Sequence, residues 1–163
     1  MFTKKSRNRL LIRIIITAYS AYPIDRKDII MNEMNEVFEM LKTAGAYFIA
    51  TCDDGQPRVR PFGTVNIYDG KFYIQTGKSK AVSHQLHVNP KLELCAMIGN
   101  DWLRVEATAV EDDSREARVS MLEAYPELKS MYSPDDGNTE VWYLRNVTAT
   151  LYSFVKPPKV YKF

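Results

Sequence analysis

Cysteine is scarce in this sequence and long apolar runs are missing, and each absence excludes a class of protein. Cys52 and Cys95, the two cysteines among 163 residues, lie far apart within apolar segments of strand-like pattern. This placement predicts free thiols in a reducing, cytoplasmic compartment and argues against a disulfide framework. The run LLIRIIITAYSAY near the N-terminus is too short to span a membrane, and Arg13 inside it argues against a cleaved signal peptide. We therefore expect no membrane partner.

Motifs of nucleophilic and metal-dependent catalysis are absent as well. The sequence contains no G-x-S-x-G motif, no phosphate-binding P-loop and no cysteine with a placed histidine. His84 and His87 are three residues apart on an expected helix, but neither a third ligand nor an H-E-x-x-H signature accompanies them. We therefore predict no metal site and interpret both histidines as surface or interface residues.

Neither sign of charge is in large excess, although the charges are unevenly distributed. The 22 basic and 20 acidic residues give a formal net charge of +2, which provides no global attraction to nucleic acid. Seven of the basic residues and two of the acidic ones lie in residues 1–30. We interpret residues 1–30 as an N-terminal extension, non-native or disordered, with translation of the functional chain starting at Met31 or Met34. Residues 31–163 are then expected to form one domain.

Hydrophobic periodicity predicts five or six strands and two or three helices. The expected helices are Asn35–Ala44, a helix capped by Ser79 and running through Val88, and Ser114–Ala124. The expected strands are Ala46–Cys52, two strands around the Asp69–Gly70 turn, Lys91–Ile98, Leu103–Glu111, and Val141–Val155 with a break at Arg145–Asn146. Strands joined mostly as hairpins favour an antiparallel barrel, which could be a split barrel or an oligonucleotide-binding barrel.

The stretch from Gln56 to Lys80 carries the strongest indication of a binding site. It contains one acidic residue, Asp69, and five basic ones, which are Arg58, Arg60, Lys71, Lys78 and Lys80. Alternating apolar residues on both sides of Asp69–Gly70 predict a hairpin whose two outer ends meet. Like charges that face each other across a hairpin destabilise it unless an anion lies between them. With a helix beginning directly afterwards, this arrangement predicts a phosphate site.

The segments PRVRPFG and FYIQTGKSKAVSHQL resemble the pyridoxamine 5'-phosphate oxidase family, the FMN-binding split barrels, over roughly residues 37–154. The resemblance implies a mainly β fold, a six-stranded antiparallel split β-barrel with inserted helices. It also implies a homodimer with FMN at the subunit interface. It places Trp102 near the flavin edge of the partner subunit, with Trp142 as a second candidate. The cofactor-binding residues that it implies are Arg58, Val59, Arg60, Pro61, Gln75, Thr76, Lys78, Ser79, Lys80 and Trp102.

The function that this resemblance implies is that of an FMN-dependent oxidoreductase with an unassigned small-molecule substrate, similar to the nitroreductase-like relatives. The missing acid–base machinery agrees with this, because in flavoproteins the cofactor carries the redox chemistry. The oxidase's C-terminal substrate-binding arginine motif is absent, so we do not expect that enzyme's activity. The alternatives are a non-catalytic flavin-binding sensor or carrier, a haem-binding split barrel, and an oligonucleotide-binding barrel. The last would stack bases on Phe62, Tyr68, Phe72 and Tyr73.

Overall fold

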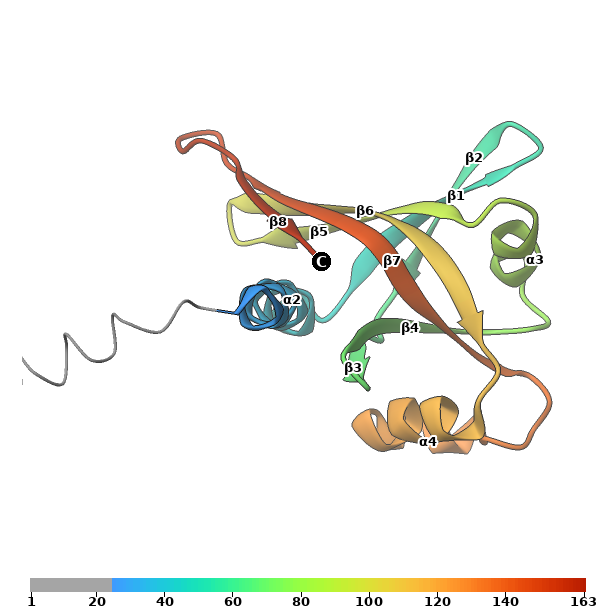
Figure 1. Cartoon of the computed structure of the whole chain (residues 1–163). Coiled ribbons are helices and arrows are strands. Elements are labelled where there is room, and N and C mark those ends of the chain that lie inside the picture. Colours follow the sequence, from blue (N-terminus) through green and yellow to red (C-terminus); the bar gives the residue numbers. More distant parts are fainter. Residues whose placement is uncertain (1–24) are drawn as a thin grey trace, which may run out of the picture.

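The computed structural model describes residues 25–163, in which one antiparallel sheet of eight strands is accompanied by three α-helices (Figure 1). The helices are α2 (Arg26–Ala44), α3 (Ala81–Val88) and α4 (Arg115–Ala124), and a 3-10 helix η1 (Pro126–Ser130) follows α4. The strands are β1 (Tyr47–Asp53), β2 (Gln56–Phe62), β3 (Asn66–Tyr68), β4 (Lys71–Gly77), β5 (Lys91–Ile98), β6 (Asp101–Asp112), β7 (Thr139–Tyr152) and β8 (Lys159–Lys162). The predicted antiparallel β fold is confirmed, with eight strands where six were expected.

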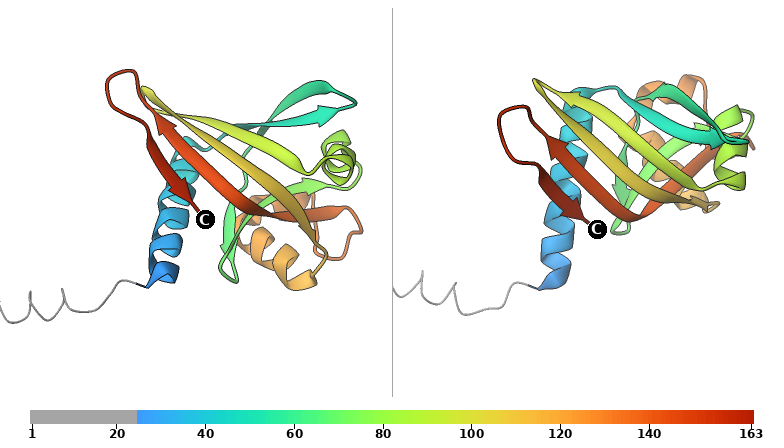
Figure 2. Two further views of the ribbon diagram at one scale, coloured as in Figure 1. Left: turned by 45° about the horizontal axis from the view of Figure 1, so that its top comes forward. Right: turned by 90° about the horizontal axis from the view of Figure 1, so that it is seen from above.

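The strands follow the order β2-β1-β5-β6-β7-β4-β3, and β8 pairs with β7. The two longest strands, β6 and β7, lie at the centre, and their register shifts between Glu106 and Thr108. Asn146 of β7 lies opposite this irregularity and has a φ of 54°, at the break that the sequence predicts. Such a bulge increases the local twist of a sheet. Beyond it, β7 changes its second neighbour from β4 to β8, so that the sheet curls (Figure 2).

Helix α2 covers the opening of the curled sheet and packs against β5 and β8 (Figures 1 and 2). It buries Met34, Val37 and Leu41, which repeat at three- and four-residue intervals as an amphipathic helix requires. The helix begins nine residues earlier than the sequence predicts, because Asp25 accepts a hydrogen bond from the backbone N–H of Lys27 and caps it. Residues 1–24 lie outside the described residues, so the N-terminal extension stays a prediction.

The prediction of a single hairpin between Gln56 and Lys80 is wrong, although the predicted turn at Asp69–Gly70 is confirmed. Asp69 and Gly70 have φ values of 48° and 67°, but they connect β4 only to the short strand β3. Strand β2 pairs with β1 along its whole length instead. The chain crosses between the two pairings at Thr64 and Val65, whose backbone groups bond to tyrosine hydroxyls from β1 and from the end of α4. Two tyrosines distant in sequence thus satisfy backbone hydrogen-bonding groups that would have paired between strands in the expected hairpin.

None of the helices described for residues 25–163 combines the length and the apolar character that crossing a membrane requires.

Candidate functional site

A cavity of about 240 Å³ lies where the ends of β2 and β4 approach η1 and the start of α3; we call it the Gln75 pocket. Four of the predicted cofactor-binding residues line it together, namely Pro61, Gln75, Thr76 and Lys80. Its remaining lining residues are Phe62, Gly63, Thr64, Leu128, Met131 and Tyr132. The crossing of the chain after β2 therefore brings the two predicted segments together even though they do not form one hairpin.

Gln75 is the polar centre of this pocket. The residue is 6% exposed, and among residues 25–163 neither its side-chain oxygen nor its side-chain nitrogen has a hydrogen-bond partner. The hydroxyl group of the neighbouring Thr76 is buried and unpaired as well. A buried polar group without a partner costs on the order of 1–3 kcal/mol, so native proteins retain few of them. An unpaired amide that borders a cavity offers one donor and one acceptor to a polar ligand.

Lys80 lies at the N-terminus of α3, beside the pocket. It occupies the N-cap position with extended backbone angles, and its own side chain makes no capping hydrogen bond. Its ammonium group lies 5.7 Å from the centroid of the Tyr132 ring and forms no ion pair with any residue in the range 25–163. Unsatisfied N–H groups and the helix dipole make such a position favourable for an anion.

The prediction that Ser79 caps α3 is wrong. The backbone N–H of Ser79 donates to the side-chain oxygen of Asn138 at 3.0 Å, and the cap position falls to Lys80. Asn138 can approach so closely because residue 77 is a glycine, at which a Cβ atom would lie 3.0 Å from the Asn138 amide nitrogen. The loop before β7 therefore fixes where α3 starts.

The two predicted arginines have different surroundings. Arg60 donates to the hydroxyl oxygen of Thr51 at 2.6 Å and to the side-chain oxygen of Gln85 on α3 at 2.7 Å. Burial, together with the neighbouring Arg58, lowers the pKa of Arg60. Arg58 forms an exposed ion pair with Asp53 at 3.2 Å. Arg60 thus holds β2 to the helix that carries Lys80, and neither Arg60 nor Arg58 lines the Gln75 pocket.

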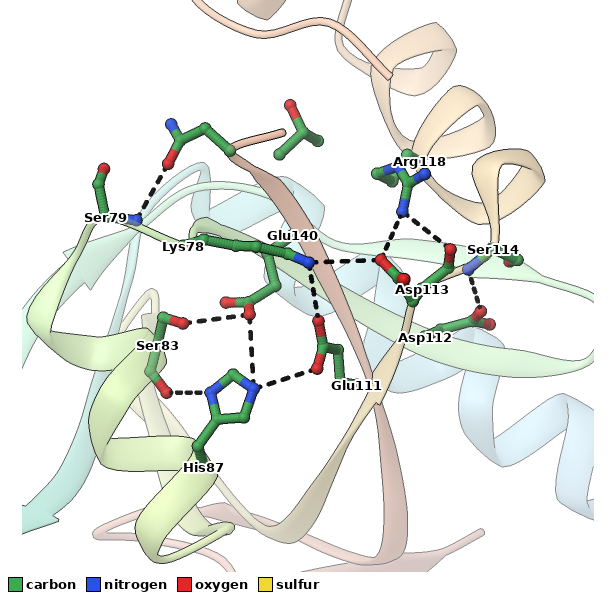
Figure 3. Close-up of polar contacts among 12 residues, drawn as sticks. Lys78, Ser79, Ser83, His87, Glu111, Asp112, Asp113, Ser114, Arg118 and Glu140 are labelled. Atoms are coloured by element: carbon green, nitrogen blue, oxygen red, sulfur yellow. Dashed lines mark hydrogen bonds and ion pairs between the residues drawn. The ribbon is translucent and has the colours of Figure 1, made fainter. Parts of the chain in front are cut away.

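Lys78 is not brought to the Gln75 pocket. Its ammonium group lies 3.4 Å from carboxylate oxygens of both Glu111 and Asp113 (Figure 3). Partial burial disfavours the charged form, but hydrogen bonds to Asp113 and Glu111 outweigh this effect and raise the pKa of Lys78. The structure therefore gives this lysine carboxylate partners.

The two tryptophans occupy opposite environments. Trp102, at the start of β6, is half-buried and stacks on Tyr152 with ring centroids 5.5 Å apart, on the outer face of the sheet. Trp142 is buried in the core, and its ring meets that of His87 edge-on at 4.9 Å. Within one chain, neither tryptophan lines the Gln75 pocket.

A second cluster, which the sequence does not reveal, joins His87 to Glu111 and Glu140 (Figure 3). The imidazole Nε2 lies 3.1 Å from an oxygen of Glu111 and 3.9 Å from one of Glu140. The hydrogen bond to the Ser83 carbonyl, with support from both carboxylates, raises the pKa of His87. The three residues come from α3, β6 and β7, so no local spacing in the sequence connects them.

The outer face of the sheet carries several apolar side chains, interrupted by Glu106 and by the ion pair of Arg104 with Glu93. In the strand registers Val59 faces Ala50, whose neighbour on β5 is Glu93, and separately Met97 faces Trp102, which pairs with Tyr152. The large apolar residues that are half or more exposed on this face are Phe48 (54%), Val59 (64%) and Met97 (62%). Pro61 pairs with Phe48 and also lines the Gln75 pocket, so the pocket opens at the border of this face.

Comparison with known proteins identifies the fold and the family. The sequence matches the pyridoxamine 5'-phosphate oxidase family over residues 34–152. A NimC/NimA family protein from Clostridium acetobutylicum is 36% identical, with a TM-score of 0.81 over 87% of this chain and 100% of its own. General stress protein 26 from Bacillus anthracis (13% identity, TM-score 0.62, 80% of this chain and 98% of its own) shares the fold.

A haem-binding protein from Mycobacterium smegmatis also shares the fold, at 14% identity and a TM-score of 0.62 over 81% of this chain and 57% of its own. No curated protein matches the sequence. The family match covers most of the chain, and the split-barrel fold agrees with it. The chain therefore belongs to the pyridoxamine 5'-phosphate oxidase family.

Proposed function

We propose that this protein is a homodimeric flavoprotein that binds FMN in the Gln75 pocket and acts as an oxidoreductase on a small molecule. The observation that carries the proposal is the buried amide of Gln75, unpaired within the described part of the chain, in the same cavity as a lysine that has no carboxylate partner there. A flavin ring has carbonyl oxygens and an N–H on its polar edge, which match an amide. Its phosphate matches Lys80 and the N-terminus of α3.

The apolar part of the pocket suits the rest of the flavin ring. Pro61, Leu128 and Met131 offer apolar surface opposite Gln75. Bound FMN would accept and return a hydride, and the side chains here would bind and orient it. Arg60 would act indirectly, because its hydrogen bond to Gln85 holds the end of β2 against α3. Lys78 and Arg58 have carboxylate partners, so we do not place them at the phosphate.

A second copy of the chain would complete the site. The pocket, at about 240 Å³, is smaller than the roughly 300–1,000 Å³ of typical ligand sites, so it would hold only part of a flavin. It opens at the border of the exposed apolar face of the sheet. A face of this kind marks a protein interface. Pairing two such faces would bring Trp102 of one subunit toward the flavin of the other.

Substitution of Gln75 tests the proposal. In Gln75→Leu, the flavin-free protein should be at least as stable as wild type, because a buried unpaired amide is removed. FMN affinity should fall about tenfold, because one hydrogen bond of about 1.5 kcal/mol is lost. Gln56→Leu, at an exposed position on β2, is the matched control and should change neither quantity. Unchanged FMN affinity in Gln75→Leu would remove the basis of the proposal.

The absorbance spectrum of the purified protein separates the remaining alternatives. Flavin bands are expected, and FMN should be released on denaturation, whereas a Soret band would assign the protein to the haem-binding relatives. Reduction of the bound flavin by a nicotinamide nucleotide, followed by reoxidation with a nitroaromatic acceptor, would show turnover. Flavin that binds but is not reduced would indicate a sensor or carrier.

A further inference from the structure

Three potential ligand atoms converge at the side of the barrel where the last turn of α3 meets β6 and β7 (Figure 3). They are Nε2 of His87, an oxygen of Glu111 and an oxygen of Glu140, and all three lie within 4.8 Å of one another. The donors are one imidazole and two carboxylates, which suit divalent ions of the first transition row. The cluster does not line the Gln75 pocket.

The histidine is held in the orientation that a metal ligand requires. Its Nδ1 lies 2.8 Å from the carbonyl oxygen of Ser83. A carbonyl oxygen can only accept, so Nδ1 carries the proton and donates it. Nε2 lies 3.1 Å from a carboxylate oxygen of Glu111, which can also only accept, so a metal ion bound there would replace a proton on Nε2. Metal-binding histidines typically donate their other ring N–H to a backbone carbonyl or a carboxylate in this way.

The carboxylate of Glu140 provides independent support for a bound ligand. Glu140 is 2% exposed, and one of its oxygens accepts a hydrogen bond from the Ser83 hydroxyl at 3.1 Å. The second oxygen has no partner among the described residues. A buried carboxylate is expensive unless a cation or several donors compensate it. The oxygen that accepts from Ser83 also lies 3.9 Å from Nε2 of His87.

We propose that His87, Glu111 and Glu140 bind a divalent transition-metal ion, for which Zn²⁺ is the best match. One nitrogen and two carboxylate oxygens from three elements form an open site, in which water completes the coordination. The site is reachable from solvent, because the side chains of His87 and Glu111 are 47% and 28% exposed. The ion would connect α3 to the two central strands and engage the buried carboxylate of Glu140.

Two substitutions should change the affinity for Zn²⁺ in opposite directions, one of them at Lys78. Its ammonium group lies 3.4 Å from the other oxygen of Glu111 and so competes with a metal ion for that carboxylate. Removal of this charge in Lys78→Met should tighten Zn²⁺ binding severalfold. Removal of a ligand in His87→Ala should weaken it by at least about 100-fold, more than the loss of an outer-shell partner does. His84→Ala changes an exposed histidine on the same helix and should leave binding unchanged.

The measurement is calorimetric titration of chelator-treated, flavin-free protein with Zn²⁺ alone. We expect one site per chain. Titration with Co²⁺ in the Trp102→Phe background provides a second readout, because Trp142 lies 4.9 Å from the His87 ring and should be quenched. His87 is on the surface, so its alanine variant should fold, which circular dichroism would check. The absence of saturable binding, or binding that survives His87→Ala, would overturn the proposal and leave a protonated His87 paired with its carboxylates.

Discussion

Lys80 is the single residue on which the proposed cofactor specificity depends. It lies at the start of α3 and has no carboxylate partner within residues 25–163. If it binds the phosphate of FMN, Lys80→Ala removes a charge-assisted bond of roughly 1.5–3 kcal/mol, or ten- to hundredfold in affinity. Riboflavin lacks the phosphate, so its affinity should be unchanged. Fluorescence titration of both flavins against both proteins measures the difference.

Lys78→Ala is the matched control for this prediction. Lys78 lies two residues earlier but is paired with Glu111 and Asp113, so its removal should leave FMN affinity nearly unchanged. The flavin-free Lys80→Ala protein should unfold at the same urea concentration as wild type, because no ion pair is lost. Equal losses of FMN and riboflavin in Lys80→Ala would contradict the placement of the phosphate.

The sequence predicted several residues that line the pocket, but it did not predict which other side chains these candidate residues contact. Pro61, Gln75, Thr76 and Lys80 meet as the family resemblance implies. Lys78 points away from the pocket because its carboxylate partners, Glu111 and Asp113, lie on and just after β6. The local sequence around Lys78 does not predict this pairing. The residues that η1 contributes to the pocket were not predicted for the same reason. Contacts between distant segments decide the direction of a side chain, and periodicity does not report them.

At the scale of elements, the loop between η1 and β7 determines the position of α3, and Asp136 organises this loop. Its carboxylate accepts hydrogen bonds from the backbone N–H groups of Ser133, Asn138 and Thr139. Desolvation by burial raises the pKa of Asp136, but these hydrogen bonds outweigh it and lower the pKa to about 2. The stabilisation they give should therefore be complete above pH 4 and lost as the pH falls from about 4 to about 2.

Comparison of wild type with Asp136→Asn measures this effect. The difference in unfolding free energy should be constant above pH 4, below about 1 kcal/mol because the residue is exposed, and should shrink toward pH 2. Urea unfolding at a series of pH values gives both curves. If the difference in unfolding free energy grew as the pH falls, it would contradict the proposed stabilisation by ionised Asp136.

Local patterns at the element scale predicted the helices and most strands, but not which strands pair. The turn at Asp69–Gly70 was correct because a D-G dipeptide favours the positive φ angles of a tight turn. The partner of β2 was wrong because the choice depends on Tyr47 and Tyr125, whose hydroxyls hold the crossing segment. The strand after Pro158, β8, was not among the predicted strands, because its place in the sheet depends on pairing with β7.

For the whole molecule, the exposed face of the sheet predicts an assembly on which flavin binding depends. Met97→Glu places a charge on that face near the end of β5, where Met97 is 62% exposed in one chain. The substitution should leave the fold intact and convert a dimer to a monomer. FMN occupancy should fall with it, because the Gln75 pocket opens at the same face. Light scattering combined with the flavin-to-protein absorbance ratio measures both quantities.

Ile29→Glu is the matched control for the assembly. Ile29 is also an exposed apolar residue, but it lies on α2 and not on this face of the sheet. It should therefore preserve both the dimer and the flavin content. A flavin-loaded monomer of wild type at micromolar concentration would refute the dependence of cofactor binding on assembly.

The unequal pairing of β7 and β2 implies an order in which the barrel opens. Strand β7 has neighbours along both edges, β6 on one and then β4 and β8 on the other, so its amide hydrogens should exchange with solvent slowest. Strand β2 has β1 as its one described neighbour, and Pro57 and Pro61 remove two of its hydrogen-bond donors. Its amides should exchange through local fraying, well before global unfolding. A cofactor held against Pro61 could then leave through a transient separation of one edge strand while the rest of the barrel stays folded.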